Sequence, residues 1–225
     1  MPGAATSFTV IGHLAPDASV TQGSDSQPAT TATLTWQSAV GGDKQVSDAR
    51  IRISAAADLG LVSSAVSSEE NETEVALAVA GKNIRFRHGV TNHGPSDAAG
   101  PITVMSNLPG RVTFAGLTED SARYWSAEVD SVDPQLAVFT QRSEIPQLGA
   151  NATSPAILYD LPLGSDLRTT GTSGSQLVST AVAQSSTPEP TSASHAHNTR
   201  MNLNIERQAD LEVGTLGSDT TAQVG

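Results

Sequence analysis

Hydrophobic and polar residues alternate along most apolar segments of this chain. In residues 84–91 every second residue falls on one face, and that face carries Ile84, Phe86, His88 and Val90. The same period of two appears in five further segments: 31–36, 49–53, 75–79, 178–182 and 201–205. Because successive side chains of a strand point to opposite faces, this pattern predicts strands that are buried on one side only.

Turn-forming sequences separate these segments at short intervals. Examples are Gly41-Gly42-Asp43, Asn92-His93-Gly94-Pro95, Leu108-Pro109-Gly110 and Thr187-Pro188-Glu189-Pro190. No amphipathic pattern of ten or more residues indicates a helix, and the acidic stretch 67–74 is interpreted as a polar loop that enters a strand. The sequence therefore predicts an all-β fold, an immunoglobulin-like Greek-key β-sandwich.

One phrase of the sequence occurs twice. Ala57-Asp58-Leu59 opens an alternating segment, and Ala209-Asp210-Leu211 opens another one 152 residues later (58 to 210). A sequence motif that recurs at a fixed spacing indicates tandem repeats. We therefore predict the end of one sandwich in residues 1–55, a complete sandwich in 56–208, and the opening strand of a third in 209–225. Since the joints are short, the array should behave as a semi-rigid rod.

The charge balance bears on the class of partner. Charged residues make up 16% of the chain, hydrophobic residues 37%, and the formal net charge is −11. A nucleic-acid-binding protein needs a basic surface, and the basic residues here occur in alternating pairs such as Arg50/Arg52 and Arg85/Arg87. We therefore expect no nucleic-acid partner.

The chain contains no cysteine, which excludes disulfides, thiolate metal sites and thiol catalysis. No apolar run reaches the roughly 20 residues of a membrane-spanning helix, so we expect no membrane insertion in this segment. The first residues lack the pattern of a signal peptide and are interpreted as a fragment boundary.

Several motifs in order resemble the bacterial surface-repeat family known as domain of unknown function eleven. Its members open with an Ala-Asp-Leu strand, then carry Thr-Asn-x-Gly-Pro-Ser-x-Ala and a Leu-Pro-x-Gly-x-x-Phe hairpin. The matching stretches here are Ala57 to Leu59, Thr91 to Ala98, and Leu108 to Phe114. The closing part of the family pattern is matched by residues 179–182, 187–190 and 197–199.

The resemblance covers residues 56–213, with two departures. Val62-Ser63-Ser64 stands where the family has Lys-Thr, and Gly41-Gly42-Asp43 stands in place of an Asp-Pro turn. The family resemblance implies immunoglobulin-type sandwiches, more distantly similar to the leg domains of integrin α chains. It also implies an extracellular stalk or adhesin on a bacterial envelope, without catalysis, whose partners are neighbouring repeats and a host or envelope protein or glycan.

Candidate metal ligands are few. His195 and His197 have the spacing of two side chains on one strand face, but no third ligand accompanies them, and closed sites need four. Bound calcium is the other candidate, with oxygens from Asp58, Asp97, Asp120 and Asp210, although no EF-hand loop is present. We expect neither a metal nor another cofactor. His88, on the apolar face of its segment, is interpreted as a hydrogen-bonded core histidine.

Two neighbouring aromatic residues are the candidate ligand contacts. Tyr124 and Trp125 lie in an otherwise polar stretch and would stack on a sugar or a protein partner, although with 4% aromatic residues most rings are expected in the core. A carbohydrate- or protein-binding module is therefore the alternative to a stalk, and an accessory domain of a secreted enzyme is a third. A lysine-to-asparagine cross-link would have to start from Lys44 or Lys82.

Overall fold

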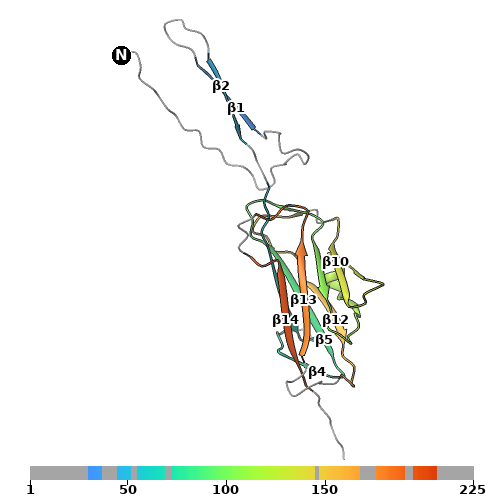
Figure 1. Ribbon diagram of the computed structural model, residues 1–225. Coiled ribbons are helices and arrows are strands. Elements are labelled where there is room, and N and C mark those ends of the chain that lie inside the picture. Colours follow the sequence, from blue (N-terminus) through green and yellow to red (C-terminus); the bar gives the residue numbers. More distant parts are fainter. Residues whose placement is uncertain are drawn as a thin grey trace, which may run out of the picture.

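The computed structural model describes residues 30–36, 45–51, 55–68, 72–144, 147–167, 176–190 and 195–206 (Figure 1). Within these residues nearly all regular structure is strand, and the one helix is the single turn α1 (Glu119–Ala122). No helix in this part of the chain is long and apolar enough to cross a membrane. The predicted all-β class is confirmed.

The smaller main sheet has four strands in the order β3-β5-β12-β8. They are β3 (Leu59–Val66), β5 (Asn83–Asn92), β12 (Ile157–Pro162) and β8 (Gly116–Leu117). All neighbours in this sheet are antiparallel.

The larger sheet has six strands in the order β4-β14-β13-β7-β10-β9. They are β4 (Leu77–Val79), β14 (Asn198–Glu206), β13 (Gln176–Gln184), β7 (Thr103–Asn107), β10 (Leu136–Gln141) and β9 (Trp125–Val129). Every pair is antiparallel except β4 and β14, which run parallel. A small pair of strands, β6 (Ala98–Ala99) and β11 (Gln147–Leu148), lies outside both main sheets.

The strand order is that of an immunoglobulin-type sandwich. The order β3-β5-β12-β8 corresponds to strands A, B, E and D of that fold, and β14-β13-β7 to strands G, F and C. Two strands, β10 and β9, extend the larger sheet beyond the C position, as extra strands do in variable-type domains. The predicted immunoglobulin-like sandwich is therefore confirmed.

Two further strands, β1 (Thr30–Trp36) and β2 (Gln45–Ile51), form a separate antiparallel sheet of their own. They fall within the predicted first unit, residues 1–55. The predicted third unit, residues 209–225, lies outside the described residues, so the tandem boundaries stay predictions.

The core lies between the two main sheets. Strand β5 buries every second residue, so the alternation of Ile84, Phe86, His88 and Val90 is confirmed. The largest fully buried aromatic side chains outside β5 come from three other strands and are Trp125, Phe139 and Tyr159. The Tyr159 ring is within aromatic contact of two others, with ring centroids 4.9 Å apart for Phe139 and Tyr159 and 5.8 Å for Phe86 and Tyr159.

The segment after β7 differs from the hairpin that the family resemblance implies at residues 108–114. Leu108 and Val112 are buried, but residues 108–115 form an irregular connection. The reason is that this segment crosses from β7 in the six-stranded sheet to β8 in the four-stranded sheet. Strand pairing begins again only at β8, which pairs with β12. Residue Arg111 adopts φ 67° in this connection, which no strand allows.

The predicted turn at Asn92-His93-Gly94-Pro95 is held by the Asn92 side chain. Asn92 bonds its own backbone two residues on, because its Oδ1 accepts from Gly94 N at 3.0 Å. However, Gly94 does not have a positive φ. A Cβ at this position would lie 2.5 Å from the backbone N of Asp58, so glycine is needed for close approach of two chain segments.

The two ends of the sandwich are far apart along the strands. The start of β3 lies beside the end of β5, since Leu59 pairs with Asn92. The end of β14 lies beside β4 and the turn before β5, since Ala80 N donates to the Glu206 carbonyl. The chain therefore enters the sandwich at one end of β5 and leaves it at the other (Figure 1).

Candidate functional site

The candidate contacts Tyr124 and Trp125 face different surroundings. Trp125 is fully buried, and its indole Nε1 donates to the Pro155 carbonyl at 3.0 Å. Its ring therefore has no face on the surface for a ligand. Tyr124 is 41% exposed and precedes β9 at the rim of the larger sheet. A ligand contact at Tyr124 stays a prediction.

The predicted histidine pair is split between two acidic partners. His195 Nδ1 lies 2.9 Å from Asp58 Oδ2, whereas His197 Nδ1 lies 3.0 Å from Glu189 Oε2. The His195 ring stacks on His93 with ring centroids 3.6 Å apart. Within the described residues no group of three metal-ligating side chains gathers, here or elsewhere.

Gly60 on β3 lies against the His93 ring of this stacked histidine pair. A Cβ on Gly60 would lie 2.9 Å from Nε2 of His93, so the imidazole rests against the bare backbone of β3. The stacked pair thus closes the entry end of the sandwich. Nothing in the sequence motif at Asp58 indicated this packing, because its partner lies 137 positions away.

The described aspartates proposed for calcium have other partners. Asp97 accepts from Ala150 N and from Gln147 Nε2, both at 2.9 Å. Asp120 is exposed on α1 and pairs with Arg123 at 3.5 Å. The structure therefore does not bring Asp58, Asp97 and Asp120 to one site. Asp210 lies outside the described residues.

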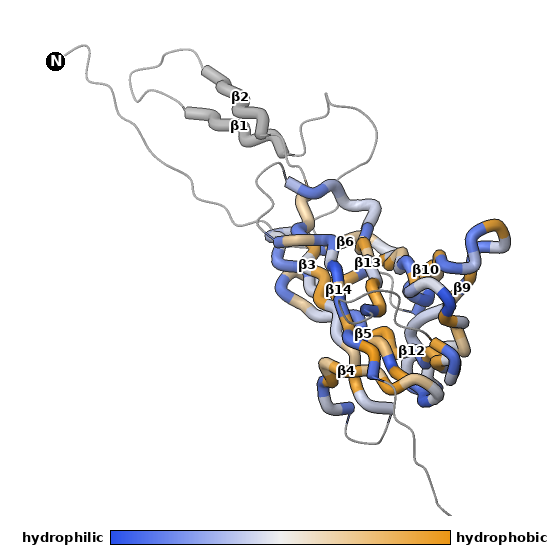
Figure 2. Tube along the Cα trace, turned by 60° about the horizontal axis from the view of Figure 1, so that its bottom comes forward, coloured by the Kyte–Doolittle hydropathy of each residue, from blue (hydrophilic) through white to orange (hydrophobic). Residues whose placement is uncertain are grey.

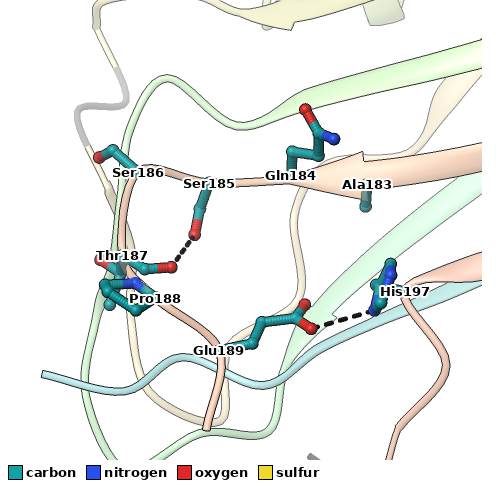
Figure 3. Close-up of a pocket in the computed structure, with 8 residues that line it drawn as sticks. All are labelled: Ala183, Gln184, Ser185, Ser186, Thr187, Pro188, Glu189 and His197. Carbon is teal, nitrogen blue, oxygen red and sulfur yellow. Dashed lines mark hydrogen bonds and ion pairs between the residues drawn. The ribbon is translucent and has the colours of Figure 1, made fainter. Parts of the chain in front are cut away.

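A shallow recess lies next to the Glu189 and His197 pair (Figure 3). Its volume is about 330 Å³, and it is lined by residues 183–189 and His197. Ser185 Oγ donates to the Thr187 carbonyl at 3.0 Å, so the hydroxyl and the carboxylate in the recess are both engaged within the protein. The residues that line the recess include no Phe, Tyr or Trp ring on which a sugar could stack.

The core contains a chain of polar groups that the sequence predicted only in part. Ser63 Oγ lies 2.6 Å from His88 Nδ1, and His88 Nε2 lies 3.0 Å from the Tyr159 hydroxyl. That hydroxyl lies 3.3 Å from Ser106 Oγ on the facing sheet, and Ser106 lies 3.5 Å from Ser179 Oγ. The interpretation of His88 as a hydrogen-bonded core histidine agrees with this arrangement.

The Ser63 and His88 pair has the spacing of a nucleophile and its base, but not the chemistry. Burial lowers the pKa of His88 to about 4, which makes it a weak base at neutral pH. Burial likewise raises the pKa of Tyr159 far above its ordinary value, so its hydroxyl stays protonated. With His88 1% exposed, no substrate reaches the pair. The polar chain instead ties the two sheets together.

The described lysine does not satisfy the requirement for a cross-link. Lys82 is exposed in the turn before β5, whereas the reaction needs a desolvated amine. Lys44 lies outside the described residues. Intramolecular cross-linking from Lys82 is therefore not supported.

Comparison with known proteins gave structural neighbours only. No family model and no curated protein matches the sequence. Similar solved structures include the major pilin SpaD from Corynebacterium diphtheriae, at 10% identity and TM-score 0.42, covering 66% of this chain and 33% of the pilin. The major pilin BcpA of Bacillus cereus is 7% identical with TM-score 0.42, covering 77% of this chain and 47% of that one.

A third similar structure is the collagen adhesin of S. aureus, at 9% identity and TM-score 0.33. It covers 81% of this chain and 57% of the adhesin. The chain thus spans less than two thirds of the length of each of these proteins. At these identities and TM-scores the likeness carries no information about ligand or partner.

Proposed function

We propose that this chain is a non-catalytic structural module of a bacterial cell-surface or secreted protein, acting as a semi-rigid stalk or spacer between similar units. The observation that carries the proposal is the position of the first and last strands of the sandwich. Strand β3 begins at one end and β14 finishes at the opposite end, so units joined in series extend along the strand direction.

This layout gives the module resistance to stretching. A pull on the two ends acts along the axes of β3 and β14. Strand β3 is bonded to β5 over eight residues, and β14 to β13 over seven and to β4 over three. Because ladder hydrogen bonds lie across the strands, an axial pull loads them together in shear. Unfolding then requires many bonds to break at once.

The interior supports the same proposal. The polar side chains that cross the core from Ser63 to Ser179 bond to one another, and the ionisable pair at the entry end joins Asp58 to His195. Such groups hold the two sheets in register. The recess beside Glu189 and His197 is shallow, and the Ser185 hydroxyl and the Glu189 carboxylate in it are engaged within the protein.

Two alternatives remain weaker on specific grounds. A carbohydrate-binding module would use Tyr124, but Trp125 does not join it at the surface, so a two-ring stacking platform is missing there. An accessory domain of a secreted enzyme would depend on chain outside this sequence.

Single-molecule force spectroscopy tests the proposal. Residues 1–225 are pulled first by their two ends and then from a Val132→Cys anchor on the β9–β10 loop to the C-terminal end. The cysteine-free chain makes this single attachment specific. We expect a clearly higher unfolding force in the end-to-end geometry. Equal or lower forces end to end would refute a load-bearing role.

A pair of proline variants locates the resistance. Ala80→Pro removes the bond from Ala80 N to the Glu206 carbonyl, at 3.0 Å, and should lower the end-to-end force. Ala127→Pro lies on β9, away from both terminal strands, and should leave it unchanged. The reverse ranking would contradict the assignment of the load to β14 and its neighbours.

A further inference from the structure

We infer that the free edge of β9, together with the loop that joins it to β10, is a docking surface for an extended, basic segment of a partner protein, which adds to the larger sheet as a further strand. This inference concerns binding and does not depend on the load-bearing proposal. Three features of β9 support it: an open edge, exposed apolar side chains beside that edge, and acidic charge.

The register of β9 shows which backbone groups face outward. Tyr124 and Asp130, which flank β9, are bonded to residues at the two ends of β10. Arg142 N, one residue past β10, donates to the Tyr124 carbonyl, and Asp130 N donates to the Leu136 carbonyl, both at 2.9 Å. Since bonded and non-bonded pairs alternate, the N–H and C=O groups of Ala127 and Val129 point away from β10. In the described residues these groups have no hydrogen-bond partner.

The other edges of the two main sheets are closed or short. Along β3, Leu61 N donates to the Ala196 carbonyl and the Ala65 carbonyl accepts from Val75 N, both at 2.9 Å. Edge strands β4 and β8 are three and two residues long. Proteins usually cover the unpaired backbone groups of a long edge strand. An edge strand whose backbone groups stay unpaired can therefore bind a strand of another chain.

Apolar side chains are exposed beside this edge. The exposed large hydrophobic residues of the described chain are five, and three of them lie here: Tyr124 at 41%, Val129 at 38% and Val132 at 91%. Val132 sits in the β9–β10 loop, which stands out from the body of the sandwich (Figure 2). Such residues are costly to expose and typical of interaction sites.

The loop is held in one shape before any partner arrives. Asp130 Oδ1 accepts from Val132 N at 2.7 Å and from Asp133 N at 2.9 Å, and these bonds lower the pKa of Asp130. Asp133 Oδ1 accepts from Gln135 N at 3.0 Å. A preorganised surface loses less entropy on binding.

The acidic charge along the β9 edge favours a basic partner segment. Glu128, Asp130 and Asp133 are exposed, and none of them is within ion-pair distance of a basic group in the described residues. A strand laid against Ala127 and Val129 would place alternate side chains next to Glu128, where lysine or arginine fits best. A second copy of this acidic edge would bring like charges together, so a basic partner is favoured over self-pairing.

The test uses a labelled peptide of about nine residues that alternates lysine with valine, and its binding to residues 1–225 is followed by fluorescence polarisation. Ala127→Pro removes an outward N–H and should weaken binding about tenfold, the effect of one lost hydrogen bond. Ala127→Val keeps the N–H and is the matched control. Urea unfolding should show both variants to be as stable as the parent.

Further measurements separate strand addition from general attraction to an acidic protein. A peptide that alternates glutamate with valine should not bind. Unchanged binding of the lysine peptide to Ala127→Pro would show diffuse charge attraction and overturn the inference. Dimers of the parent chain in light scattering, abolished by Ala127→Pro, would assign the edge to self-pairing and equally overturn the basic occupant.

Discussion

The two longest edge strands of this sandwich, β3 and β9, have different surroundings. At β3 the chain itself supplies cover, with Leu61 bonded to Ala196 and the His93 ring lying on Gly60. At β9 no described segment comes within hydrogen-bonding distance of Ala127 or Val129. Closure at β3 depends on contacts between distant parts of the sequence, whereas β9 is held by the buried Trp125, by its hairpin to β10 and by contacts with the nearby elements α1 and β8.

The largest expected effect tests that anchor. Trp125→Ala removes a fully buried indole beneath β9 and should cost about 4 kcal/mol of unfolding free energy. Tyr124→Ala, one residue away and 41% exposed, should change it by less than about 0.5 kcal/mol. Urea unfolding of both variants measures the difference. Comparable losses would mean that Tyr124 also packs as a core residue.

A pH titration tests the polar chain that starts at β3. In the unfolded chain His88 takes up a proton near pH 6.5, whereas burial lowers its pKa to about 4 when folded. The unfolded state therefore binds more protons between pH 6.5 and 4, and stability should fall by about 3 kcal/mol as the pH drops through this range. Above pH 6.5 His88 contributes no pH dependence.

His88→Phe isolates this contribution from that of the carboxylates. The variant should be less stable at neutral pH, because the Ser63 and Tyr159 hydroxyls lose their partner, and its stability should decline less steeply between pH 6.5 and 4. Unfolding free energies at several pH values give both slopes. Parallel slopes would show that His88 is not buried as a neutral ring.

The closed edge is tested at Gly94. Gly94→Ala would place a Cβ 2.5 Å from Asp58 N and 2.7 Å from the Ala56 carbonyl, and should cost about 2 kcal/mol by forcing the entry segment away from β5. Gly89→Ala is the matched control, because its Cβ would meet nothing within 4 Å. Thermal and urea unfolding compare the two. A tolerated Gly94→Ala would mean that cover at this end is loose.

The smallest effect concerns Gln141, on the strand that supports β9. Its side chain is 2% exposed, and neither amide atom has a protein hydrogen-bond partner. Gln141→Leu should therefore raise the unfolding free energy by about 1 kcal/mol, since a buried amide without a partner is costly. A loss of stability in urea unfolding would show that the amide is satisfied through solvent.

The alternation of side chains predicted much of the fold because burial on one face is a local property. It placed His88 with the core side chains of β5, and it predicted most of β13 and β14. The same period applies to β9, where Trp125, Ala127 and Val129 share a side, and would have separated buried Trp125 from exposed Tyr124. Adjacent residues on a strand face opposite ways, so the two rings were never able to form one platform.

Other features were not predictable from local pattern. The contact of His195 with Asp58 and the hydrogen bond of His88 to Tyr159 join residues 137 and 71 positions apart. Which polar groups meet depends on the register of whole strands, and no residue type or spacing encodes it. The irregular crossing at residues 108–115 was missed for the same reason, since its apolar side chains enter the core without strand pairing.

The sheet order has a mechanical consequence for a string of such modules. Strands β14 and β4 lie at one side of the larger sheet and β9 at the other, with β13, β7 and β10 between them. If such modules are joined in series as proposed, tension would run through β14 and β4, and a partner strand bound at β9 would lie outside the loaded strands. Stretching the array would then not require that partner to dissociate.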